Sequence, residues 1–510
     1  MNKQTSDCNE RKQVLLILVL ATSSGIFGSI QNLSHGYILH QPEYWCSPKK
    51  VNLSIRTGPH ADLSPADKCK MYKSSKTKSS PIPCDHWDYD RSEYTETAVT
   101  QFNLVCGAKY WIYLSQSTYI FGYVLGTLLS GIISDKFGRR PTILASAFLC
   151  HLFSSAAAFS QDVLVFNIFR FFIAAAAVSF YCVSYTYSME IVQASKKSFV
   201  SASFSISIAV GMSLVPLLSW LLPRWSDLQL LGTLPTIFIL IPLSVSSFFN
   251  ESTKWLSVNG FNSKGELMIR DPHSEKSNLI QVEPHSESSS SLLWQNIARC
   301  HGLIFSTVVL VYIWCVFITI FLFVLMNFKK IVPGNSTFNI ELISGLDLVA
   351  GFITFPLVRF ADRRLSISLC LALTGSSFIV HCFHPHPVCK QICAQLGVFF
   401  NTLCFNLMSV YTIEIYPTAI RGMALGMLNA VGRTAAMVCP LLLIFLHRGE
   451  EFCLFAGLAL MAGGFVWLLP ETRYVEMKDT IADGEQFNRE SGGLRYFQKQ
   501  ASMSPSCDTE

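Results

Sequence analysis

The dominant pattern along the chain is a succession of apolar runs, each about 20 residues long, separated by shorter polar segments. An α-helix needs runs of this length to cross a hydrocarbon core about 30 Å thick. Unbroken apolarity is typical of membrane helices, whose backbone groups are bonded within one segment, and differs from the alternation of barrel strands. The pattern predicts an all-α membrane protein. Its twelve transmembrane helices are expected at residues 14–37, 111–133, 141–160, 163–188, 199–222, 228–249, 302–327, 338–358, 365–384, 391–415, 422–446 and 452–470.

The polar segments divide the predicted helices into two sets of six. The polar stretch at 271–291 is rich in serine, histidine and acidic residues, a composition that cannot bury a core, so we expect partial disorder there. The tail beyond Gly484 has a similar composition, and we expect the same of it. The predicted parts are an N-terminal segment at 1–13, a first six-helix bundle at 14–249 with a long loop at 38–110, a linker at 250–300, a second six-helix bundle at 301–470 and a tail at 471–510.

The first apolar run follows Lys3, Arg11 and Lys12, a pattern that a cleaved signal peptide would also show. The run continues to about Tyr37 without a cleavage site, which favours a retained first helix.

The composition agrees with a membrane protein. Half of the 510 residues are hydrophobic and 14% are charged, whereas a soluble domain carries about 25% charged residues. No basic patch lies on a polar surface, which excludes a nucleic-acid-binding class. We find no phosphate-binding loop, metal cluster or nucleophile triad, so the sequence implies neither an enzyme nor a cofactor. No motif identifies a coupling ion or an oligomeric state.

The basic residues of the short loops set the expected orientation. With twelve helices they all fall on one side, which the positive-inside rule makes cytoplasmic. We therefore expect a multi-pass protein of the plasma membrane with both termini in the cytoplasm. These residues are Lys136, Arg139, Arg140, Lys196, Lys197, Arg359, Arg363, Arg364 and Arg421.

The loop at 38–110 has the features of an extracellular segment. Most of the 17 cysteines lie inside apolar runs, but Cys46, Cys69, Cys84 and Cys106 share this polar loop. Four cysteines in an oxidising compartment predict two disulfides, and three pairings remain open. The glycosylation acceptors Asn52 and Asn335 also fall on the outer side.

A ten-residue segment between the second and third runs, Gly131-Ile-Ile-Ser-Asp135-Lys-Phe-Gly138-Arg139-Arg140, is the most informative motif. Its small residues allow helix ends to approach closely, and Asp135 can pair with an arginine of a neighbouring turn. The segment resembles the signature loop of the major facilitator superfamily of transporters. A basic loop that only obeys the positive-inside rule is the alternative.

The second half of the chain repeats charged elements of the first at a spacing of about 220 residues. Repeat-built transporters bind substrate at the midplane between their halves and rock the halves alternately open. We expect the repeated charges, at cytoplasmic helix ends, to pair when an inner gate closes; simple anchoring at the membrane surface is the alternative. The predicted gating residues are Gly131, Asp135, Gly138, Arg139, Arg140, Glu190, Lys197 and Glu251 in the first half, and Asp362, Arg363, Arg364, Glu414, Arg421, Glu471 and Arg473 in the second.

Further motifs resemble one transporter family, that of the organic cation, organic anion and carnitine transporters (solute carrier family 22). They include Pro42-Glu-Tyr-Trp-Cys46 in the long loop, Tyr411-Thr-Ile-Glu-Ile-Tyr-Pro-Thr-Ala-Ile-Arg421 after the tenth run, and Pro470-Glu-Thr-Arg473 after the twelfth. The resemblance implies the major facilitator fold, two pseudo-symmetric six-helix bundles, and transport of a small organic ion by alternating access. Two departures are Lys197, where the family usually has arginine, and Asp362, where it usually has glycine.

Arg433 is the strongest candidate for a substrate-binding residue. It lies about eleven residues into the eleventh run, which places it about 16 Å deep in the bilayer. A central arginine costs roughly 2.5 kcal/mol or more, so it must face a cavity or a partner. It is either a binding group for a substrate anion or half of a buried ion pair with Asp347 in the eighth run.

The resemblance bears on the charge of the substrate. Cation carriers of the family have an acid at the position of Arg433, whereas anion and carnitine carriers have arginine. Anion carriers also tend to have a lysine where this chain has Gly351. A carnitine-like zwitterion fits both positions, and its ammonium group would contact an acid or aromatic faces. The predicted substrate-binding residues are Arg433, Asp347, Gln116, Tyr119, Phe317 and Phe321.

Three functional hypotheses follow. The first is a transporter of zwitterions or organic anions. The second is an organic cation transporter, with Asp347 as the cation site and Arg433 as part of a gate. The third is a non-transporting membrane receptor or scaffold built on the same fold.

Overall fold

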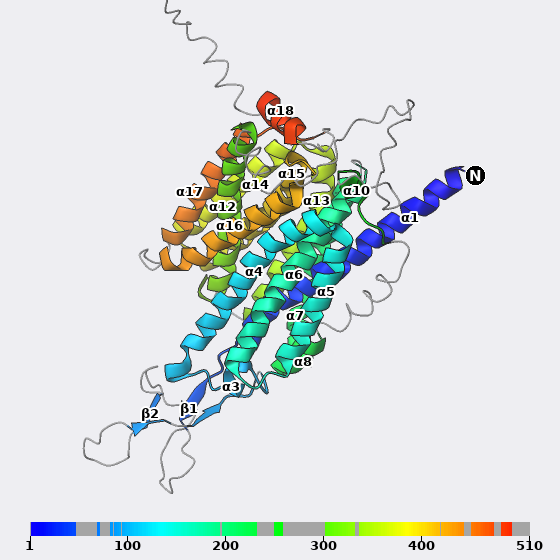
Figure 1. Ribbon diagram of the computed structural model, residues 1–510. Coiled ribbons are helices and arrows are strands. Elements are labelled where there is room, and N and C mark those ends of the chain that lie inside the picture. The colour runs from blue at the N-terminus through cyan, green and yellow to red at the C-terminus, as the bar shows by residue number, and fades with distance from the viewer. Residues whose placement is uncertain are drawn as a thin grey trace, which may run out of the picture.

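The structure is a computed structural model and consists almost entirely of helices (Figure 1). The residues that it describes are 2–46, 69–71, 82–84, 86–92, 94–193, 196–231, 249–258, 301–331, 336–418, 420–442, 450–473 and 481–491.

The first half begins with one long helix, made of α1 (Asn2–Ala21), a π-helical turn (Thr22–Ile26) and α2 (Phe27–Ile38). The hydroxyl groups of Ser23 and Ser24 donate to carbonyls four residues earlier, which is the kind of side-chain competition that alters helical geometry. The other long helices of this half are α4 (Tyr110–Phe137), α5 (Arg139–Ala158), α6 (Val163–Ile191) and α7 (Lys197–Leu221), followed by the short helices α8 (Trp225–Leu231) and α10 (Thr253–Val258).

The described part of the second half contains six long helices and a short terminal one. They are α12 (His301–Ile331), α13 (Ser336–Phe360), α14 (Arg363–Phe383), α15 (Pro387–Ile415), α16 (Arg421–Leu442), α17 (Glu450–Phe465) and α18 (Ile481–Ser491).

Ten of the described helices are long and apolar enough to cross a membrane, and they coincide with ten of the twelve predicted runs. The predicted run at 422–446 forms α16, which contains Arg433 and is not among the ten. The run at 228–249 lies mostly outside the described residues. The all-α membrane fold expected from the hydrophobic pattern is confirmed.

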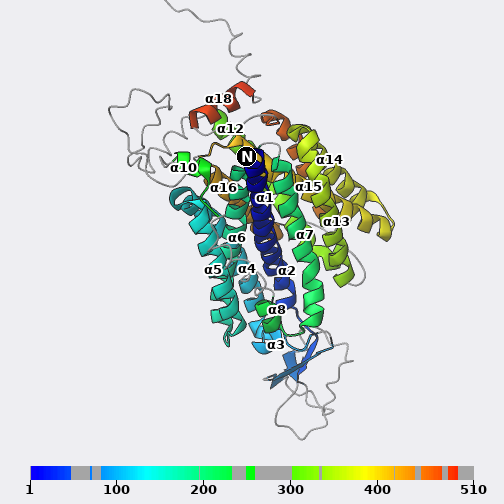
Figure 2. The same cartoon turned by 90° about the vertical axis from the view of Figure 1, so that its right-hand side faces the viewer.

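The two halves repeat the same packing relations. Helix α6 packs against α4 and α5, and its counterpart α15 packs against α13 and α14. The halves meet along two seams, one between α4 and α16 and the other between α7 and α13. Figure 2 shows α7 and α13 side by side at the second seam.

The first seam depends on small residues. A Cβ atom at Gly131 on α4 would lie 2.6 Å from the carbonyl oxygen of Gly422 on α16. Such close approach of backbones is typical of helix contacts in membranes. The small residues of the ten-residue motif therefore hold the two halves together at this end.

The loop after α2 folds over one end of the bundle, which we call the disulfide end (Figure 1). Its disulfides are Cys46–Cys84 and Cys69–Cys106, one of the three pairings that the sequence left open. Strands β1 (Tyr44–Cys46) and β4 (Trp87–Tyr89) pair antiparallel, as do β2 (Lys70–Met71) and β3 (Ile82–Pro83), and the short helix α3 (Ala98–Gln101) follows. The predicted glycosylation acceptors Asn52 and Asn335 and the predicted disordered stretch at 271–291 lie outside the described residues.

Helix α18 lies at the opposite end (Figure 1), which we call the charged end. The expectation of partial disorder beyond Gly484 is wrong for this helix. The carboxylate of Glu485 accepts hydrogen bonds from the backbone amides of Gly302 and Leu303, at 3.0 and 2.9 Å. The amide oxygen of Asn488 accepts one from Ser306 at 2.7 Å. The tail helix thus satisfies amides at the start of α12, which otherwise have no partner within their own helix.

Candidate functional site

The predicted gating charges form two equivalent buried pairs at the charged end. Glu190, at the end of α6, accepts hydrogen bonds from Nη2 and Nε of Arg139 at 3.0 and 3.2 Å. Glu414, at the end of α15, accepts one from Nε of Arg363 at 3.3 Å. Both pairs are separated by 51 residues along the chain. The repeat seen in the sequence is therefore also a repeat of geometry.

Two further ion pairs join the halves to each other. The Nζ of Lys197 lies 3.4 Å from Glu414 of the other half. In the reverse direction, Nη1 of Arg421 lies 3.7 Å from Glu190. All these side chains are buried. These cross-half pairs cannot persist when the halves separate at this end. We call Arg139, Glu190, Lys197, Arg363, Glu414 and Arg421 the charge cluster.

Asp135 adds a contact between the halves that has no equivalent in the second repeat. One carboxylate oxygen lies 2.8 Å from Nη1 of Arg139, and the other accepts a hydrogen bond from the backbone amide of Met423 at 3.0 Å. Met423 is in the first turn of α16, where a negative charge is favourable. At the position equivalent to Asp135, four residues before the first arginine, the second motif has Arg359. Its acid, Asp362, occupies the position of Gly138 and pairs with Arg473 of its own half at 2.8 Å.

Glu251 and Glu471 cap helices within their own halves. Glu251 accepts the backbone amides of Arg139 and Arg140 at 2.9 and 3.0 Å. Glu471 accepts those of Arg363 and Arg364 at 3.0 and 3.1 Å. In this structure the two acids therefore satisfy the starts of helices in their own halves, and their predicted part in gating stays a prediction.

The second arginine of each motif lies over an aromatic ring of its own half. The guanidinium of Arg140 lies over the ring of Phe249 at 5.8 Å. That of Arg364 donates to the carbonyl of Trp467 at 2.7 Å and lies over its ring. Neither guanidinium joins the charge cluster.

A cavity of about 1060 Å³ lies between the halves. It extends from Asn429 and Arg433 towards His40, Gln41 and Ser92 at the disulfide end. The residues of the charge cluster are not among those that line it. The six predicted substrate-binding residues all line this cavity: Arg433, Asp347, Gln116, Tyr119, Phe317 and Phe321.

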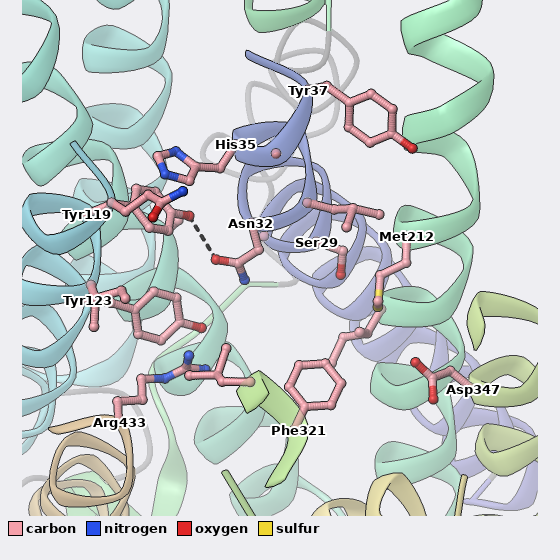
Figure 3. A pocket seen from close by; sticks show the side chains of 18 of the residues that line it. Ser29, Asn32, His35, Tyr37, Tyr119, Tyr123, Met212, Phe321, Asp347 and Arg433 are labelled. Atoms are coloured by element: carbon pink, nitrogen blue, oxygen red, sulfur yellow. Dashed lines mark hydrogen bonds between the residues drawn. The ribbon is translucent and has the colours of Figure 1, made fainter. Parts of the chain in front are cut away.

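Arg433 and Asp347 line the same cavity without contacting each other. Arg433 donates from Nε to Asn429 at 2.9 Å, and its guanidinium lies 3.6 Å from the centre of the Tyr123 ring. Asp347 accepts a hydrogen bond from Thr402 at 2.8 Å. Figure 3 shows the two charges on opposite sides of the cavity, with Phe321 between them. The alternative of a buried ion pair is therefore wrong for this conformation. Arg433 instead donates to the neutral Asn429, and Asp347 accepts from the neutral Thr402.

Several polar lining residues were missed by the sequence reasoning. Asn32, Asn401 and Asn406 line the cavity, and the amide oxygen of Asn32 accepts a hydrogen bond from Tyr119 at 2.8 Å. The sequence contained the information to predict them. A polar side chain inside an apolar run is expected to face the bundle interior, for the same reason as Arg433. Within the described residues, no group of three or more histidine, cysteine or acidic side chains could hold a metal ion.

Comparisons with known proteins agree with this geometry. The model of the family described as "Sugar (and other) transporter" matches residues 60–480. The organic cation transporter-like protein of Drosophila melanogaster is 25% identical, over 96% of this chain and 93% of that protein. Solute carrier family 22 member 1 of Bos taurus is 26% identical, over 94% and 91% respectively. Solute carrier family 22 member 6 of Mus musculus is 27% identical, over 83% and 80%.

Solved structures share the fold at low sequence identity. The proton:xylose symporter XylE of the major facilitator superfamily, bound to 6-bromo-6-deoxy-D-glucose, superimposes with a TM-score of 0.61 at 15% identity, covering 95% of this chain and 99% of that chain. The human organic anion transporter MFSD10 (TETRAN) gives a TM-score of 0.54 at 12% identity, covering 90% and 99%. With a matching family model over most of its length and the expected fold, the chain belongs to the sugar (and other) transporter family of the major facilitator superfamily, is similar to organic cation transporters and other solute carrier family 22 members, and is a transporter rather than an enzyme.

Proposed function

We propose that this chain moves small zwitterions or organic anions across the plasma membrane by alternating access. The observation that carries the proposal is that Arg433 and Asp347 face one cavity without pairing. A carboxylate would bind the guanidinium fork of Arg433, which suits bidentate contact. The ammonium of a carnitine-like betaine would lie towards Asp347 and the face of Phe321.

The orientation is part of the same proposal. The charged end lies in the cytoplasm with both termini, and the disulfide end is extracellular. The structure is then open to the outside and closed to the inside. Transport requires the two halves to rock about the cavity, which separates the cross-half pairs of the charge cluster.

A second candidate is transport of organic cations, and a specific observation favours it. Asp347 contacts Thr402 but no cation within the described part of the chain, so its charge is available to an ammonium substrate. Three relatives, two from Drosophila melanogaster and one from Caenorhabditis elegans, have names that include the words organic cation transporter. In this case Arg433 acts as part of a gate rather than as a ligand.

Uptake of three labelled probes separates these candidates: a betaine such as carnitine, an aromatic carboxylate and a tetraalkylammonium ion. In the proposed function, Arg433→Gln reduces uptake of the betaine and the carboxylate about 10- to 150-fold, the equivalent of a charge-assisted hydrogen bond of about 1.5–3 kcal/mol. Asp347→Asn reduces uptake of the betaine but leaves that of the carboxylate.

The matched control is Arg359→Gln, which removes an exposed arginine that lies over Phe360 outside the cavity. Surface expression is measured for every variant. Carboxylate and betaine uptake that survive Arg433→Gln, with cation uptake lost in Asp347→Asn, would establish the cation transporter instead.

A further inference from the structure

Arg170 is a second arginine beside the cavity, and it is completely buried in α6. Its guanidinium lies 4.4 Å from the centre of the Tyr119 ring. Its Nη2 lies 2.7 Å from Nδ1 of His35. The buried arginines of the charge cluster each contact a glutamate, whereas Arg170 contacts no carboxylate among the described residues. An uncompensated charge in a membrane-spanning helix is expensive and marks a functional site.

The contact with His35 defines the protonation state of its ring. A guanidinium carries only donors, so Nδ1 of His35 must accept from it. The ring proton of a neutral histidine is then on Nε2. The imidazole stacks on Tyr119 with centroids 5.3 Å apart, and His35 lines the cavity (Figure 3). His35 therefore presents a second donor beside Arg170.

The buried polar atoms left without partners here are all donors. Within the described chain, Nε and Nη1 of Arg170, Nε2 of His35 and Nδ2 of Asn167 have no hydrogen-bond partner. Asn167 lies three residues before Arg170 on the same face of α6, and its oxygen already accepts a bond from Ser115. Buried donors are normally satisfied, and here a positive charge accompanies them.

We propose that Arg170, His35 and Asn167 bind one small monovalent anion, either a halide or the carboxylate group of an organic ion. A water molecule can accept bonds from two donors but leaves the charge of Arg170 uncompensated. An anion satisfies the donors and neutralises the charge together. Because Tyr119 and Tyr123 are one turn apart on α4, the arginines that lie over them are neighbours along the cavity wall. The anion site lies nearer to the disulfide end than Arg433.

Thermal stability of the full-length protein in lipid nanodiscs tests this site independently of transport. The measurement uses the Arg433→Gln variant, so that any stabilisation by an anion does not come from the proposed substrate site at Arg433. Sodium chloride and sodium acetate each replace sodium sulfate, whose anion is divalent and carries no carboxylate, at constant ionic strength. We expect a saturable rise of about 2 °C in the apparent melting temperature. A response to chloride alone identifies a halide site, and a response to acetate identifies a carboxylate site.

Adding Arg170→Gln to this background is expected to abolish the rise, and adding His35→Phe to reduce the apparent anion affinity several-fold. Because Arg170→Gln can itself unfold the protein, a second measurement uses the unaltered chain with bromide, whose anomalous scattering should place one ion beside Arg170. Absence of the thermal response in the Arg433→Gln background, its persistence after Arg170→Gln, or bromide found only elsewhere would overturn the proposal.

Discussion

The guanidinium of Arg433 is oriented by two neutral groups, the amide of Asn429 and the ring of Tyr123. Neither group neutralises its charge, so the charge remains available to a ligand in the cavity. A carboxylate in place of either group would remove that availability. Binding of an anionic group by Arg433 therefore requires that the guanidinium be held in position without an acidic residue beside it.

Replacing Tyr123 by leucine removes the aromatic face beneath Arg433 and should weaken carboxylate uptake. A cation–π contact of about 0.5–2 kcal/mol corresponds to a roughly 2- to 30-fold rise in KM. Tyr123→Phe keeps the ring and serves as the matched control, with near-normal uptake expected. Equal losses in both variants would show that the hydroxyl group, not the ring face, matters at this position.

That Arg433 faces a cavity or a partner was predictable, because a charge deep inside an apolar run is too costly to face lipid. The identity of its neighbours was not. The position of Asp347 in its apolar run places it at a similar depth in the membrane. Depth alone does not determine which wall of a cavity a side chain lies on. Tyr123 carried no signal of its own, because aromatic residues make up 13% of the chain.

At the scale of elements, helices α5 and α14 begin with the same kind of glutamate cap but are preceded by different residues. Each is capped by a glutamate that arrives from the end of its own half, Glu251 or Glu471. Gly138 precedes α5 with φ of 104°, and a Cβ there would lie 2.5 Å from the Glu251 carboxylate. Asp362 precedes α14 with φ of −69°, which any residue can adopt. The missing glycine of the second motif therefore has a conformational explanation.

This difference predicts unequal effects of alanine at two equivalent positions. Gly138→Ala should destabilise the protein by about 1–3 kcal/mol from the positive-φ, extended backbone alone, with a further loss if Glu251 is displaced from its cap. Asp362→Ala removes only an exposed ion pair and should change stability by less than about 1 kcal/mol. Thermal unfolding of both variants in detergent makes the comparison. A similar loss of stability in the two variants would contradict this account of the motif.

The order of the helices was largely predictable, since apolar length determines which segments cross a membrane. Helix α18 was not, because its sequence is mostly polar and resembles that of a solvated tail. Its position depends on Glu485 and Asn488 meeting the start of α12, and no local pattern reveals a contact with a segment about 180 residues away.

At the scale of the whole molecule, the echoed charges predicted two similar halves, and the two halves of the structure meet at the ion pairs of the charge cluster. The sequence did not show which of these pairs cross between the halves. In the structure, Arg139 and Arg363 bind carboxylates of their own halves, whereas Lys197 and Arg421 bind those of the opposite halves. Only the pairs made by Lys197 and Arg421 depend on whether the halves are together at the charged end. Mutation of these two residues is therefore expected to shift the equilibrium between the open and closed forms.

Lys197→Gln removes one cross-half pair and leaves Arg363 in place beside Glu414. Breaking a buried pair costs about 3–5 kcal/mol, and here the loss falls on the state closed at the charged end, so the ratio of open to closed forms at that end should rise at least tenfold. Spin labels at the exposed positions Lys136 and Arg359, on opposite halves, report the change as a longer distance. Arg473→Gln, which breaks a pair within one half, is the matched control and should leave the distances unchanged. If Lys197→Gln leaves them unchanged as well, or if both variants lengthen them equally, the cross-half pairs do not hold this end closed.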